Sequence, residues 1–156
     1  MPPIDLLELE AFLSGYWMTD LSNFSAFLFE RLPDVNWVGF YLSDGKTLRL
    51  GPFCGKPACL EIPFGQGVCG QAFEQAETLL VADVDLFPGH IRCDSNSKSE
   101  IVIPLLIFGE LVGVLDVDSP KAARFSKNDK AFLEEAVQIL SLKISNYSGV
   151  RFGNIS

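Results

Sequence analysis

The chain has 156 residues, a formal net charge of -8 and 48% hydrophobic residues, among them 13 Phe. This length fits one domain, and the apolar content can fill a core, which excludes an intrinsically disordered chain. The negative charge and the lack of a Lys/Arg cluster argue against a nucleic-acid partner. We therefore expect a single domain over residues 1–156, with its core at about 20–145.

The N-terminal segment MPPIDLLE lacks the basic and long apolar regions of a signal peptide. No apolar run approaches the ~18 residues of a transmembrane helix. We expect a cytoplasmic protein without membrane contact. In that reducing compartment the four cysteines are expected to be free, catalytic or metal-bound, not a disulfide framework.

Helical periodicity predicts helices at residues 6–32 (as one or two helices), 68–75 and about 126–144. The first region is broken near Gly15 and stopped by Pro33. The last helix begins at Ser126, a plausible N-cap with Asp129 at the third helical position. Terminal helices are therefore expected at both ends of the domain.

Period-two alternation and turn residues predict strands at residues 35–42, 47–53, 58–62, 78–82, 101–107 and 111–117. The first two and the last two strands read as hairpins. A polar loop is expected at 83–99. Two hairpins flanked by terminal helices indicate an α+β domain, with a mainly antiparallel sheet, helices on one face and a ligand pocket on the other.

Alternation places Trp37, Gly39 and Tyr41 on one face of their strand and the apolar residues between them on the other. The all-apolar face is expected to be core. The opposite face has two aromatic residues around a glycine, and we expect a pocket floor there with space above the glycine.

Three carboxylates are candidates for the same pocket. Asp116 and Asp118 share one face of the last strand, and burial of both without a partner is costly. They are either an exposed strand-end or capping pair, or an anionic wall for a ligand ammonium or a proton donor. Glu100 alone is typical of a solvated strand-end charge, but near a reactive cysteine it becomes a candidate acid.

Cys93 lies in the polar loop 87–100, where a cysteine kept for packing is not expected. This position indicates an exposed, reactive thiol. Cys59 and Cys69 are upstream partners, which suggests redox turnover. Cys54 is interpreted as structural or incidental, although it could pair with Cys59.

Residues 65–70 (GQGVCG) match the dinucleotide pattern G-x-G-x-x-G, but Pro63 interrupts the preceding strand and the helix is short for a parallel crossover. A helix N-terminus that receives a small carboxylate is the better interpretation. His90 and three of the cysteines could ligate zinc, yet their spacing forms no paired knuckles. We expect a plain loop histidine, no metal and no cofactor.

Six motifs together resemble one family: DVNWVGFYL (34–42), LGPF (50–53), GQGVCG (65–70), GHIRCDS (89–95), SEIVIPL (99–105) and GVLDVDS (113–119). Over about residues 20–145 the chain resembles the free methionine-(R)-sulfoxide reductases, which are stand-alone GAF domains. Ordinary GAF sensors lack the three ordered cysteines. The resemblance implies a GAF-like fold and thiol-dependent reduction of free L-methionine-(R)-S-oxide to L-methionine.

The resemblance also implies roles for the cysteines. Cys93 corresponds to the nucleophile, Cys59 to the resolving cysteine, and Cys69 to an auxiliary or alternative resolving cysteine. The expected cycle runs through a Cys93 sulfenic acid and an intramolecular disulfide, which thioredoxin or a similar dithiol reduces. Cys54 has no required counterpart in the family.

The implied substrate site combines an aromatic and an acidic part. Trp37 and Tyr41 match the pocket around the methyl end of the sulfoxide. Glu100, Asp116 and Asp118 match the acids that hold the amine and the sulfoxide oxygen, with Glu100 or Asp118 as proton donor. A homodimer is left open, and the rival interpretations are a non-enzymatic GAF-type sensing module and a thiol redox sensor.

Overall fold

The computed structural model describes residues 4–91, 93 and 96–148; residues 92 and 94–95 of the predicted loop and motif lie outside the described part. The elements, in chain order, are α1 (Leu6–Glu10), α2 (Trp17–Arg31), β1 (Trp37–Ser43), β2 (Thr47–Gly55), β3 (Glu61–Pro63), α3 (Gly67–Gln75), β4 (Leu79–Val81), η1 (Val84–Leu86), β5 (Ser99–Ile107), β6 (Glu110–Ser119) and α4 (Lys127–Lys143).

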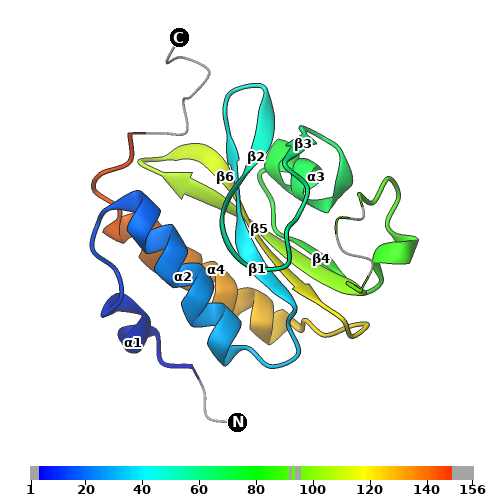
Figure 1. Cartoon of the computed structure of the whole chain (residues 1–156), viewed down its shortest axis with the longest axis horizontal. Coiled ribbons are helices and arrows are strands. Elements are labelled where there is room, and N and C mark those ends of the chain that lie inside the picture. Colours follow the sequence, from blue (N-terminus) through cyan, green and yellow to red (C-terminus); the bar gives the residue numbers. More distant parts are fainter. Residues whose placement is uncertain (1–3, 92, 94–95, 149–156) are drawn as a thin grey trace.

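The strands form a six-stranded sheet in the order β3-β2-β1-β6-β5-β4, in which every neighbouring pair is antiparallel. Figure 1 shows α2 and α4 side by side along one face of this sheet, whereas α3 lies on the opposite side. The predicted α+β class and the helices on one face are confirmed. Both hairpins, β1–β2 and β5–β6, are confirmed as well.

Both faces of the sheet are buried, which differs from the expectation of one core face. Val38, Phe40 and Leu42 pack under α2 and α4 in one apolar cluster. Trp37 and Tyr41 belong to a second cluster that includes residues of α3. Because α3 and the segment before β3 cover the second face, its aromatic side chains are as inaccessible as the first core.

The expected space above Gly39 is absent, and this prediction was wrong. An ideal Cβ on Gly39 would overlap Phe53 Cβ and lie 2.7 Å from Trp37 Cη2. The rings of Trp37 and Phe53 stack with centroids 5.2 Å apart. The glycine therefore permits close packing of two aromatic rings from β1 and β2 and leaves no cavity above itself.

Two local predictions need correction. The third strand is confined to Glu61–Pro63 and does not begin at 58. Ala58 lines the pocket, and the carbonyl oxygen of Leu60 accepts a hydrogen bond from Leu50 N of β2 (3.0 Å). The loop expected over 83–99 contains the 3-10 turn η1, whose N-cap Asp83 accepts a hydrogen bond from Asp85 N. The predicted start of the last helix is confirmed by a capping box between Ser126 and Asp129.

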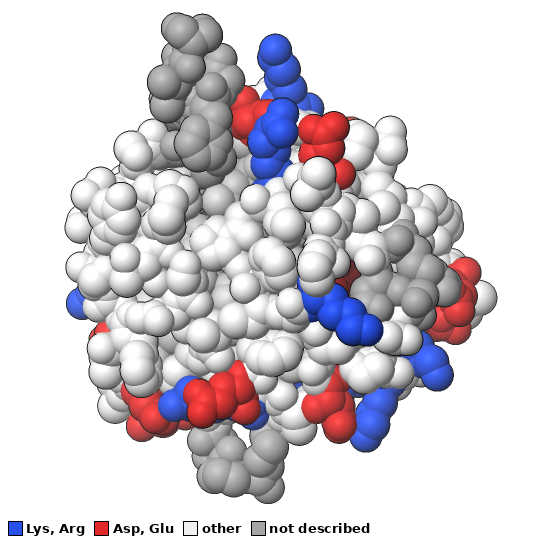
Figure 2. Space-filling view, viewed as in Figure 1, with Lys and Arg blue, Asp and Glu red and all other residues white. Residues whose placement is uncertain are grey.

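On the face shown in Figure 2, Lys and Arg side chains lie beside Asp and Glu side chains near the edges, and they form no continuous basic surface there. Within residues 4–148 as far as they are described, no helix combines the length and the apolar character needed to cross a bilayer.

Candidate active site

A pocket opens on the sheet face that α3 covers. It contains about 520 Å³ of space not filled by atoms, open solvent at its mouth included. Its lining comes from β1, β3, β5, β6, α3, the segment before β3 and the loop before β5. The lining residues are Trp37, Tyr41, Lys56, Pro57, Ala58, Ile62, Gly67, Val68, Cys69, His90, Ile91, Cys93, Ser97, Glu100, Asp116 and Asp118.

Cys59 and Cys93 form a disulfide beside this pocket, with their Cα atoms 5.4 Å apart. The bond joins the segment before β3 to the loop before β5, and both cysteines are half-buried. We expected an exposed thiol at Cys93; the disulfide draws it against the pocket instead. Cys54 and Cys69 are free thiols, of which Cys69, in the first turn of α3, is 3% exposed.

The aromatic wall is fixed by two hydrogen bonds to the segment before β3. Trp37 Nε1 donates to the carbonyl oxygen of Lys56 (3.1 Å), and Tyr41 Oη donates to that of Cys59 (2.9 Å). The two rings stack with centroids 5.9 Å apart. The segment that carries Cys59 is thus anchored on the same side chains that line the pocket.

The three carboxylates come together across two strands. Glu100 of β5 stands directly opposite Asp118 of β6, and Asp118 stands opposite Trp37 of β1. Glu100 is 6% and Asp116 5% exposed, so they are buried acids and not the exposed strand-end charges that remained an alternative. The free thiol of Cys69 lies 3.9 Å from Glu100 Oε2.

Cys69 Sγ and one oxygen each of Glu100 and Asp116 lie within 4.8 Å of one another. That spacing alone also fits a metal site. Acids packed this closely share protons without a metal, because like charges resist joint ionisation. We therefore interpret the cluster as a proton-sharing group.

The surroundings shift the pKa values of Asp116 and Glu100 in opposite directions. Burial, reinforced by the charges of Asp118 and Glu100, raises the pKa of Asp116 well above its ordinary value. Burial also acts to raise the pKa of Glu100, but contacts with His90, Asp116 and Asp118 outweigh it and lower that pKa. The arrangement favours an ionised Glu100 beside a protonated Asp116.

The thiol and the phenol of the pocket both hold their protons. Burial, followed by the neighbouring acid cluster, raises the pKa of Cys69 well above that of an ordinary thiol. Burial and the same acids also raise the pKa of Tyr41. Both groups are hydrogen-bond donors in this pocket, not anions.

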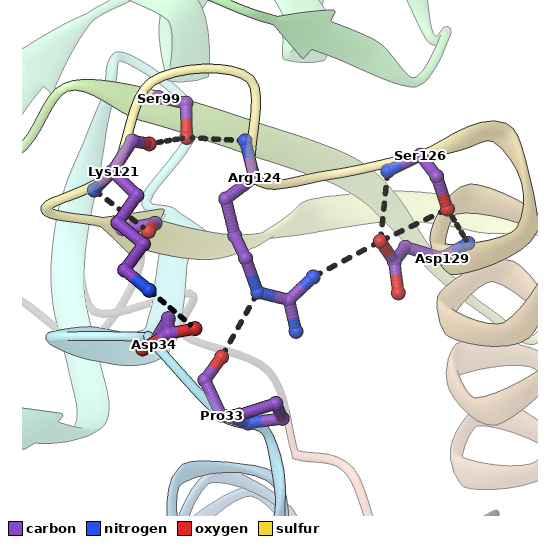
Figure 3. A network of polar contacts seen from close by, with 8 residues as sticks. Pro33, Asp34, Ser99, Lys121, Arg124, Ser126 and Asp129 are labelled. Carbon is purple, nitrogen blue, oxygen red and sulfur yellow. Dashed lines mark hydrogen bonds and ion pairs between the residues drawn. The ribbon is translucent and has the colours of Figure 1, made fainter. Parts of the chain in front are cut away.

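A polar network joins the start of β5 to the segment between β6 and α4 (Figure 3). Ser99 Oγ donates to the carbonyl oxygen of Lys121 (2.6 Å) and accepts from Arg124 N (3.3 Å). The Arg124 guanidinium donates to the carbonyl oxygen of Pro33 (2.9 Å) and to Asp129 Oδ2 (3.1 Å). Glu100, next to Ser99, is therefore carried on a strand end that is tied to β6 and α4.

All the site residues proposed from the sequence line the pocket or stand at the disulfide beside it. His90, which was interpreted as a plain loop histidine, also lines the pocket: its Nε2 lies 3.5 Å from Glu100 Oε1. Nothing local in the sequence signals this contact, since ten positions separate the two residues. Gly67 and Val68 of the first turn of α3 line the pocket as well.

Comparison with known proteins shows the family to which the chain belongs. The model of the GAF domain family matches residues 25–144, so this part of the chain is a GAF domain. The chain is 49% identical over 132 residues to the free methionine-R-sulfoxide reductase of Escherichia coli (strain K12), which covers 83% of this chain and 80% of that protein.

Two solved structures agree. The free methionine-R-sulfoxide reductase from Neisseria meningitidis, in complex with its substrate, matches with a TM-score of 0.85 and 44% identity over 89% of this chain and 85% of that one. The reduced form of fRMsr of Staphylococcus aureus matches with a TM-score of 0.85 and 45% identity over 92% and 97%. The chain belongs to the free methionine-R-sulfoxide reductase family.

Proposed function

We propose that this chain is an oxidoreductase that reduces free L-methionine-(R)-S-oxide to L-methionine with its own cysteines as electron donors. The observation that carries the proposal is the Cys59–Cys93 disulfide beside a pocket with an aromatic wall and three carboxylates. The relatives that bear the name of this activity support the choice of substrate.

The pocket offers a partner for each part of the free amino acid. Trp37 and Tyr41 suit the apolar methyl and thioether end, since sulfur packs well against aromatic rings. An ionised Glu100 suits the ammonium. The first turn of α3, where backbone N–H groups lack intrahelical acceptors, suits the carboxylate. A methionine within a peptide lacks both charges, so this site selects the free form.

The first chemical step needs a soft nucleophile and a proton. The Cys93 thiolate attacks the sulfoxide sulfur while a carboxyl proton moves to the oxygen. The substrate's sulfur–oxygen bond breaks as the hydroxyl passes to the Cys93 sulfur, and the transient sulfur–sulfur bond cleaves. Methionine leaves with two more electrons, and Cys93 is left as a sulfenic acid. Because Asp116 is the acid whose pKa is raised, we place the proton on Asp116 in preference to Glu100.

Cys59 then resolves the sulfenic acid. Its sulfur bonds to the sulfur of Cys93, and the hydroxyl leaves as water. Thioredoxin or a similar dithiol returns two electrons and two protons to this disulfide. A half-buried disulfide suits exchange with an external dithiol. Cys69 suits neither step, because it is buried and its pKa is raised.

The test is turnover with dithiothreitol on the free (R) sulfoxide, the (S) epimer and a peptide-bound sulfoxide. Wild-type protein is expected to reduce the free (R) form alone, and Cys93→Ser to be inactive. Cys54→Ser is the matched control and keeps full activity. An inactive wild type would favour a sensing module, and a fully active Cys93→Ser would contradict Cys93 as the nucleophile.

A further inference from the structure

His90 is the chain's single histidine, and the proposed reaction does not use it. It lies in the loop before β5, three positions before Cys93, and its side chain is 12% exposed. Its Nε2 is 3.5 Å from Glu100 Oε1. Its backbone N–H donates to the carbonyl oxygen of Phe87 (3.2 Å), which anchors the residue in a turn.

The surroundings of this contact are acidic on several sides. Besides Glu100 of β5, the ionisable side chains that line the pocket are Asp116 and Asp118 of β6, Tyr41 of β1, Cys69 of α3 and Lys56 of the segment before β3. Lys56 is exposed at the rim. His90 is a basic side chain within ion-pair distance of this cluster, through its Nε2 and Glu100 Oε1.

We infer that His90 is a positioning residue for the reduction: it fixes the negative charge of the acid cluster on Glu100 and leaves the transferable proton on Asp116. The inference rests on the proposed function. An N–H donor or a cation beside one of several close carboxylates favours the ionised form of that one. Its neighbours then resist ionisation, since like charges are costly together in a buried site.

The consequence is a division of labour within the cluster. Glu100 stays anionic and suits the substrate ammonium, while Asp116 keeps a proton for the sulfoxide oxygen. Because His90 belongs to the loop that carries Cys93, the same contact also ties the nucleophile's loop to the acids. Loss of His90 lets Glu100 take the proton from Asp116. Glu100 is then neutral and cannot pair with the substrate ammonium, and Asp116 is ionised and has no proton for the sulfoxide oxygen.

The direct test follows the carboxyl ¹³C signals of labelled glutamate during a pH titration, with Glu100→Gln to assign the signal. Glu100 is expected to titrate at higher pH in His90→Phe than in the wild type, and at an intermediate pH in His90→Gln, which keeps a donor without a charge. Lys98→Gln, which removes an exposed cation two positions from Glu100, is the control and leaves the signal unmoved. An unchanged Glu100 titration in both His90 variants overturns the inference.

The second readout is the pH profile of kcat/KM for the free (R) sulfoxide. We expect the acid limb of this profile to move to higher pH in His90→Phe, with partial recovery in His90→Gln, because the ionised form of Glu100 loses its nearest donor. A merely structural histidine lowers stability without moving the profile, and that result overturns the role in the reaction. Should the wild type show no turnover, the proposed function fails while the titration still decides where His90 directs the charge.

Discussion

Tyr41 Oη donates a 2.9 Å hydrogen bond to the carbonyl oxygen of Cys59. One side chain therefore belongs to the aromatic wall of the pocket and also fixes the backbone of the cysteine that pairs with Cys93. Burial, followed by the nearby acids, raises the pKa of Tyr41, so the phenol remains a donor at physiological pH.

Tyr41→Phe is expected to slow the resolving step, in which Cys59 bonds to Cys93, and to leave the attack of Cys93 on the sulfoxide unchanged. A hydrogen bond of this kind contributes about 1 kcal/mol, which corresponds to a roughly fivefold slower closure of the disulfide. The lifetime of the Cys93 sulfenic acid, trapped with dimedone after one turnover, measures this step. Tyr16→Phe, at a half-exposed tyrosine outside the pocket, is the control. Equal lifetimes in all three proteins contradict the assigned role.

Gly39→Ala is expected to damage both stability and substrate affinity. The new methyl group must displace Phe53 or Trp37, and overpacking of this kind costs typically 1–3 kcal/mol. Chemical denaturation and KM measure the two effects. Gly45→Ala, at a hairpin position with φ +91° and open space around it, is the comparison: it costs backbone strain alone and leaves KM unchanged. An unaltered KM in Gly39→Ala contradicts a role of the aromatic wall in substrate binding.

Asp116→Asn is expected to stabilise the protein at neutral pH while it lowers activity. The raised pKa of Asp116 means that the folded state holds its proton more tightly than the unfolded state, where the ordinary value is 3.8. Below that pH the group is protonated in both states and costs nothing. As the pH rises above it, the wild type loses stability that the variant keeps.

Unfolding midpoints at pH 4 and pH 7 check this prediction, and the gain from Asp116→Asn must grow with pH. Asp34→Asn, at a surface aspartate that pairs with Lys121, is the control and gives no such gain. A loss of stability in Asp116→Asn that is equal at both pH values contradicts a protonated Asp116.

Cys69 is expected to resist alkylation in the folded, oxidised protein. Its thiol is buried, and burial together with the nearby acids raises its pKa, whereas Cys54 is half-buried. Mass mapping after iodoacetamide treatment should find Cys54 modified and Cys69 unmodified until denaturant is added. Rapid labelling of Cys69 before Cys54 contradicts the location given to this thiol.

Local patterns were enough to predict much of the fold. Alternation on β1 separated Trp37 and Tyr41 from the apolar residues between them, and Ser126 with Asp129 indicated the start of α4; both features depend on residues close in sequence. The resemblance of the motifs supplied the pairing of Cys59 with Cys93, and the structure contains that disulfide.

The remaining features depend on register and on packing between distant segments. The opposition of Glu100 and Asp118 requires the β5–β6 register, and the contact of His90 with Glu100 requires the path of the intervening loop. Gly39 was misread because alternation tells which face a residue occupies and not what the neighbouring strand places above it. Phe53 of β2 supplied that missing ring.

The most direct measurement is one turnover of the fully reduced protein with free methionine-(R)-sulfoxide and no external reductant. Methionine yield, thiol loss and linked peptides are then determined on the same sample. The account predicts one methionine per chain, the loss of two thiols and a link between Cys59 and Cys93. Absence of methionine, or methionine formed with a dominant link from Cys69 to Cys93 or from Cys54 to Cys59, would contradict it.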